Sequence, residues 1–165
     1  MKVLIVHRYM GFYGGAENVV AQLSSTLKKK GAENLILSLN SSSEITKLHG
    51  DIEIVTPQDQ LPVVFRSASL FSSLGIFREI FALRKLIKEH IDGFDVINVH
   101  NFPATWALFG LNRKPVVWLC NEPPDFYGKA VVSAAVQIIR AMGVAIDRYI
   151  AVSYTHLTLP TKRIV

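Results

Sequence analysis

Short, continuously apolar segments alternate along this chain with longer segments that have helical periodicity. The apolar runs cover residues 2–7, 34–39, 52–55, 96–100, 115–120 and 149–152. Polar residues do not interrupt them at every second position, which is typical of strands buried on both faces of a parallel sheet. The order of segments therefore predicts an α/β fold, namely a Rossmann-like parallel sheet with helices on both faces.

Helices are predicted between these strands. Residues 16–30 carry apolar side chains at helical spacing, and Gly31 follows three lysines that suit the negative end of a helix. Three serines at residues 41–43 predict a loop, and residues 61–74 fit neither pattern. Further helices are predicted at residues 76–91, 103–110 and 129–145.

The composition agrees with one globular domain. Of the 165 residues, 50% are hydrophobic and 19% are charged, a balance that can form a full core. A single cysteine, Cys120, excludes a disulfide within the chain. The net charge of +5 fits an anionic small ligand or an acidic membrane surface. No strand interleaves basic and aromatic residues, so no nucleic acid is expected as a partner.

Two adjacent glycines, Gly14 and Gly15, separate the first predicted strand from the first helix. Ligands of open α/β sheets bind beyond the carboxyl ends of the strands, where this loop belongs. Glycine lets the backbone adopt unusual angles and approach a ligand closely, and the following helix offers free N–H groups to a phosphate. The loop has neither G-x-G-x-x-G nor a P-loop lysine, which disfavours a nicotinamide cofactor or a nucleoside triphosphate. A simple tight turn is the alternative to a phosphate site.

Four segments stand in a characteristic order along the chain. They read KVLIVHRYMGFYGGAENVVAQLSSTLKKKG, FDVINVHNFPATWA, PVVWLCNEPPDFYG and DRYIAVS. In this order they resemble the N-terminal, acceptor-side domain of retaining GT-B glycosyltransferases, in the large family that includes bacterial mannosyl- and glucosyltransferases. The resemblance covers residues 1–153.

The resemblance implies a specific reaction. A nucleotide sugar such as GDP-mannose or a UDP-sugar would donate its sugar to a glycan or lipid-linked acceptor, with retention at the anomeric carbon. It implies no metal ion and no further cofactor. Gly14, Gly15 and Ala16 would form the loop beside the donor diphosphate, and Glu17 would help to begin the helix, where its charge suits the dipole. A second Rossmann-like domain would bind most of the nucleotide sugar.

The predicted catalytic residues are His100, which ends a predicted strand, and Asn121 and Glu122, which directly follow one. The resemblance implies that all three face the sugar or the acceptor, at the edge of the sheet where ligands bind. Many members of the resembled family have histidine where this chain has Asn121. Asparagine can hydrogen-bond a sugar hydroxyl but cannot take up a proton. A packed histidine and a rigid Asn-Glu-Pro-Pro turn are the structural alternatives. His7, at the end of the first strand, has a similar claim to a functional role.

Residues 65–91 combine phenylalanines with arginines and lysines. This combination is typical of amphipathic helices that lie on the surface of an anionic membrane. The alternative is an ordinary helix with its apolar side on the sheet and a solvated charged face. No signal peptide and no transmembrane stretch are recognisable. We therefore expect a cytoplasmic protein, with peripheral contact at the inner face of the cell membrane as a further expectation.

The last segment, YTHLTLPTKRIV, fits no element of the predicted domain, because Pro160 breaks a helix there. It resembles adapter-derived sequence at the ends of translated metagenomic fragments. We expect residues 1–153 to form the N-terminal domain and residues 154–165 to be non-native. The nucleotide-sugar-binding domain would then be absent, and the chain alone would be inactive. The alternative is a non-catalytic Rossmann-like module that binds a nucleotide or a partner.

Overall fold

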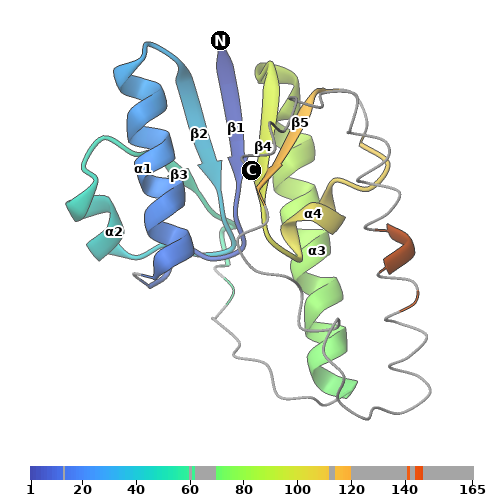
Figure 1. Cartoon of the computed structure of the whole chain (residues 1–165). Coiled ribbons are helices and arrows are strands. Elements are labelled where there is room, and N and C mark those ends of the chain that lie inside the picture. The colour runs from blue at the N-terminus through green and yellow to red at the C-terminus, as the bar shows by residue number, and fades with distance from the viewer. Residues whose placement is uncertain are drawn as a thin grey trace, which may run out of the picture.

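A sheet of five parallel strands lies at the centre of the chain. The computed structural model describes residues 1–12, 14–59, 61, 70–111, 114–119, 141 and 144–146. Within them the strand order is β3-β2-β1-β4-β5, and helices cover both faces of the sheet (Figure 1). The predicted Rossmann-like α/β class is therefore confirmed.

The strands and helices alternate as predicted, except that α2 between β2 and β3 was not predicted. The strands are β1 (Lys2–Val6), β2 (Glu33–Leu37), β3 (Ile54–Val55), β4 (Val96–His100) and β5 (Val116–Leu119). The helices are α1 (Gly15–Lys29), α2 (Ser43–Leu48), α3 (Leu70–His90) and α4 (Ala104–Ala107), and the 3-10 turn η1 (Ile91–Gly93) leads from α3 towards β4.

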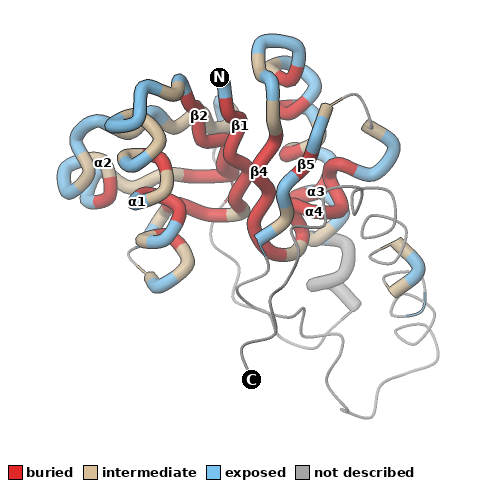
Figure 2. The backbone as a smooth tube through the Cα atoms, turned by 45° about the horizontal axis from the view of Figure 1, so that its top comes forward, coloured by how far each residue is buried: buried red, intermediate tan, exposed pale blue. Residues whose placement is uncertain are grey.

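The central strand, β1, contributes side chains to two separate cores. Leu4 and Val6 belong to the core on the side of α3 and α4, whereas Val3 and Ile5 belong to the core on the side of α1 and α2. Successive side chains of a strand point to opposite faces, so a strand covered on both faces needs apolar residues at every position. Figure 2 shows the resulting burial along β1, β2 and β4.

Helix α1 ends as the sequence predicts. Gly31 has a φ of +77°, in the left-handed region that favours glycine. Its N–H donates to the carbonyl of Lys28 at 2.9 Å, and the N–H of Ala32 donates to the carbonyl of Leu27 at 2.9 Å. These two bonds satisfy carbonyl groups that the end of the helix leaves free. The chain can then turn directly into β2.

Several elements differ from the sequence prediction. The serine loop is followed at once by the short helix α2, which Ser42 caps by accepting a hydrogen bond from the N–H of Ile45 at 3.4 Å. Six residues are too few for a helical period to be visible in the sequence. Strand β3 has only two residues, and α3 begins six residues earlier than predicted.

Several predicted features lie outside the described residues. They are the catalytic candidates Asn121 and Glu122, the strand at 149–152 and the proposed non-native tail at 154–165. Of the helix predicted at 129–145, the described residues 141, 144 and 145 are helical. Among the described residues, no helix is long and apolar enough to cross a membrane.

Candidate functional site

The carboxyl ends of β1 and β4 meet the start of α1 at one edge of the sheet (Figure 1). His7 follows β1 directly, His100 is the last residue of β4, and Gly14 and Gly15 open α1. The rings of His7 and His100 are 5.8 Å apart between centroids and stand at 89° to each other. The two histidines considered in the sequence are thus neighbours in the structure.

The side chain of Glu17 points into this edge of the sheet. Its Oε1 atom lies 3.3 Å from Nε2 of His7, and both side chains are buried. Glu17 is in the first turn of α1, where its charge suits the helix dipole, as the sequence predicts. Its contact with His7 was not predicted. This contact ties the start of α1 to the end of β1.

His100 is fully buried, and Asn98 holds its ring. Nε2 of His100 lies 2.6 Å from Oδ1 of Asn98, while Nδ2 of Asn98 donates to the carbonyl of Val117 at 3.3 Å. Burial, with a smaller contribution from the charge of His7, lowers the pKa of His100 from 6.5 to about 4. His100 is therefore neutral at pH 7, and it can act there only as a hydrogen-bonding group or a weak base.

Gly14 is needed for space rather than for backbone freedom. Its φ of −122° and ψ of −178° are extended values that any residue adopts. A Cβ atom at this position would collide with Oε2 of Glu17 and would lie 3.0 Å from Cε2 of Phe12. The expectation of unusual backbone angles is therefore wrong for Gly14. The missing side chain makes room for the carboxylate that contacts His7.

Gly15 and Ala16 form the open part of the glycine loop. Gly15 is exposed, and a Cβ atom added to it would have no neighbour within 4 Å. Ala16 is half-buried. Among the described residues, no side chain caps the start of α1. Its first N–H groups have no partner within the helix, so they can meet a phosphate.

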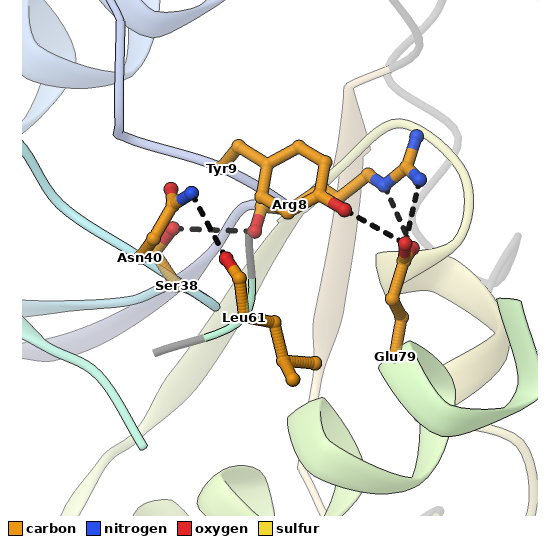
Figure 3. A network of polar contacts seen from close by, with 6 residues as sticks. All are labelled: Arg8, Tyr9, Ser38, Asn40, Leu61 and Glu79. Carbon is orange, nitrogen blue, oxygen red and sulfur yellow. Dashed lines mark hydrogen bonds and ion pairs between the residues drawn. The ribbon is translucent and has the colours of Figure 1, made fainter. Parts of the chain in front are cut away.

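A second polar network braces the chain just beyond His7 (Figure 3). Nε and Nη2 of Arg8 donate to the two carboxylate oxygens of Glu79, each at 2.8 Å, and the hydroxyl of Tyr9 donates to Oε1 of Glu79 at 2.7 Å. The Arg8 guanidinium also lies 4.5 Å from the centre of the Tyr9 ring. Bidentate, charge-assisted pairs of this kind have a defined geometry. Because Glu79 belongs to α3, the network fixes the end of β1 to that helix.

The loop after β2 holds the same segment from its other side. Ser38 donates from its hydroxyl to the carbonyl of Arg8 at 3.3 Å, and Nδ2 of Asn40 donates to the carbonyl of Leu61 at 3.2 Å (Figure 3). A Cβ atom on Gly11 would lie only 2.8 Å from Oδ1 of Asn40. Residues 8–11 are therefore packed closely against the loop that follows β2.

The sequence analysis did not name Asn98 as a site residue, although the sequence contains a signal for it. Asn98 is a polar residue within an apolar strand, two positions before His100, so the two side chains share one face. The burial of Glu17 and its contact with His7 had no such signal, because an acidic residue in the first turn of a helix is usually solvated.

The predicted place of Asn121 and Glu122 beside His100 stays a prediction.

The described residues contain no group of three or more side chains that could hold a metal ion.

The low pKa of His100 predicts a specific dependence of stability on pH. Between pH 6.5 and about 4 the unfolded chain takes up a proton on His100 that the folded chain does not. The free energy of unfolding should therefore fall by about 3 kcal/mol from this group as the pH decreases across that range. Urea unfolding at several pH values measures the fall. His100→Gln should remove most of it, whereas His90→Gln, at the end of α3, should leave it in place. An unchanged slope in the His100 variant would contradict the assignment.

Comparison with known proteins places the chain in a family. Among solved structures, MurG of Acinetobacter baumannii is similar at 15% sequence identity and a TM-score of 0.47, over 86% of this chain and 38% of that one. The chain thus spans well under half of the length of MurG. The search of curated proteins found no match. The family described as Glycosyltransferase Family 4 matches residues 13–157, which is most of the sequence. The chain therefore belongs to Glycosyltransferase Family 4.

Proposed function

We propose that the protein acts as a retaining GT-B glycosyltransferase and that this chain forms its N-terminal, acceptor-side domain. The donor is a nucleotide sugar such as GDP-mannose or a UDP-sugar, the acceptor is a glycan or a lipid-linked glycan, and no metal ion takes part. The observation that carries the proposal is the family match over residues 13–157, which includes the glycine loop and β4. A second domain would bind most of the donor, so this chain alone would bind it weakly.

The geometry of the glycine loop supports a diphosphate site at the start of α1. Gly15 is exposed and has open space where a side chain would be, so a ligand can approach its backbone. The helix dipole and the free N–H groups of the first turn favour a negative group at this point. The carboxylate of Glu17, in the same turn of the helix, contacts His7.

Contact with a membrane is also part of the proposal. Phe77 and Phe81 are one turn apart on α3 and are 39% and 67% exposed, and Arg78 and Lys85 on the same helix are exposed as well. Aromatic side chains flanked by basic ones suit the surface of an anionic bilayer. An acceptor with a lipid anchor would be presented at that surface, at the inner face of the cell membrane.

Gly15→Asp tests the diphosphate site. A carboxylate at the first position of α1 suits the helix dipole, so the free energy of unfolding should stay equal or rise by up to about 1 kcal/mol. The same charge repels a diphosphate, so the affinity for UDP or GDP, measured by calorimetry, should fall roughly tenfold. Gly15→Asn has nearly the same shape without the charge and should bind within about threefold of wild type. Equal binding by the Asp and Asn variants would show that the diphosphate lies elsewhere.

Phe81→Ser tests the membrane contact. The wild-type chain should sediment with vesicles that contain phosphatidylglycerol and much less with vesicles of phosphatidylcholine alone. Loss of the Phe81 ring should weaken binding to these vesicles roughly tenfold, because the ring, exposed in the free chain, would be buried in the bilayer surface. Leu48→Ser is the matched control, since Leu48 is 64% exposed on α2, on the other side of the sheet. Equal losses in both variants would contradict a specific role for α3.

A further inference from the structure

The guanidinium of Arg8 is held on one edge and open on the other. Glu79 accepts from Nε and from Nη2, each at 2.8 Å, so the two N–H groups of Nη1 take no part in this pair. Nη1 points away from Glu79 and has no hydrogen-bond partner among the described residues (Figure 3). The Arg8 side chain is 18% exposed, and Nη1 is not one of the buried nitrogens that lack a partner. A ligand can therefore reach it.

The position of this guanidinium is fixed by several contacts. The side chain of Glu79 is only 6% exposed, and its Oε1 also accepts from the hydroxyl of Tyr9 at 2.7 Å. The guanidinium carbon lies 4.5 Å from the centre of the Tyr9 ring, and the backbone carbonyl of Arg8 accepts from Ser38 at 3.3 Å. The donors of Nη1 are thus oriented before a ligand arrives, which lowers the cost of binding.

Arg8 lies at the ligand edge but on the opposite face of the sheet from the glycine loop. Successive side chains alternate between the two faces. His7 accordingly faces α1, where it contacts Glu17, and Arg8 faces α3, where it contacts Glu79. The start of α1, proposed above for the donor diphosphate, is on the side of His7. The open edge of Arg8 is therefore placed for a different substrate.

The helix that holds Arg8 also carries the exposed aromatic rings. Glu79 is buried and lies between Phe77 and Phe81, which are 39% and 67% exposed. The proposed membrane surface and the contact with Arg8 are thus within about one turn of α3. A lipid-linked acceptor whose glycan is joined to its lipid through a phosphate would present that phosphate at the bilayer surface, next to this turn.

We propose that Arg8 binds a phosphate group of the lipid-linked acceptor through Nη1. This inference rests on the proposed function. Arginine binds phosphate oxygens through charge-assisted N–H bonds. The Glu79 carboxylate offsets the charge of Arg8, so directed bonds from Nη1 hold the phosphate more than net charge does. The donor diphosphate is the other source of a phosphate group, and the two sources are separated by experiment.

Calorimetry with the 165-residue chain tests the proposal, with farnesyl diphosphate as the acceptor probe. Arg8→Lys keeps a charge beside Glu79 but loses the planar fork, so the affinity for farnesyl diphosphate should fall roughly tenfold. The affinity for UDP should stay within about threefold of wild type. Tyr9→Phe is the matched control, because it removes one bond to Glu79 and leaves every donor of Arg8 in place. Equal losses of farnesyl diphosphate binding in both variants would show a general disturbance of the network and overturn the proposal.

Side-chain NMR of nitrogen-labelled arginine in the wild-type chain is a second test, which does not depend on the folding of any variant. The Arg8 signals are assigned by their proximity to the Tyr9 ring. Farnesyl diphosphate should shift the Nη1 signal, whereas farnesol, which has no phosphate, and UDP should leave it unchanged. A shift of equal or greater size with UDP would assign the site to the donor and overturn the acceptor site. No shift with either phosphate compound would overturn phosphate binding by Arg8.

The same titrations separate this inference from the proposed function. Binding of UDP or GDP, with no effect of farnesyl diphosphate on Arg8, would overturn the Arg8 site and leave the proposed function standing. Failure of UDP and GDP to bind, with the expected shift of Nη1, would contradict the donor site of the proposed function and support the phosphate site at Arg8.

Discussion

Burial of β1 on both faces is the constraint on which the rest of the structure depends. Its side chains alternate between the core under α1 and the core under α3, so the strand cannot shift along its axis or turn over without exposing one of them. The residues that follow it therefore emerge at a fixed point, between the ends of β2 and β4. That point is the carboxyl edge, where ligands of parallel sheets bind.

The polar residues at this edge are held from both sides of the sheet. Glu17 reaches His7 from α1, and Glu79 reaches Arg8 from α3. Consecutive residues after β1 thus have partners in helices that cover opposite faces. Such a site is arranged before a ligand arrives, which lowers the cost of ordering it on binding. The open backbone at Gly15 is next to this rigid group, so an approachable loop and a fixed polar pair lie together.

The sequence predicted the fold better than it predicted the site. Continuous apolar runs and helical periods depend on local composition, and they placed β1, β4 and α1 within one or two residues. Contacts such as Arg8 with Glu79, 71 residues apart, depend on how a helix packs on the sheet, which no local pattern records. Gly14 shows the difference most clearly. The sequence predicted a loop there, but only the structure shows that the nearby Glu17 carboxylate leaves no room for a side chain at this position.

The proposed function requires the polar carboxyl edge of this domain to bind a nucleotide sugar. Backbone amide NMR of the labelled chain, titrated with UDP-glucose or GDP-mannose, locates the binding site. The largest shift changes should fall on Gly15, Ala16 and Glu17 and on the residues around His7 and His100, with little change on α2 or at the amino ends of the strands. Changes centred on α2 or on the opposite edge of the sheet, or none at saturating ligand, would contradict it.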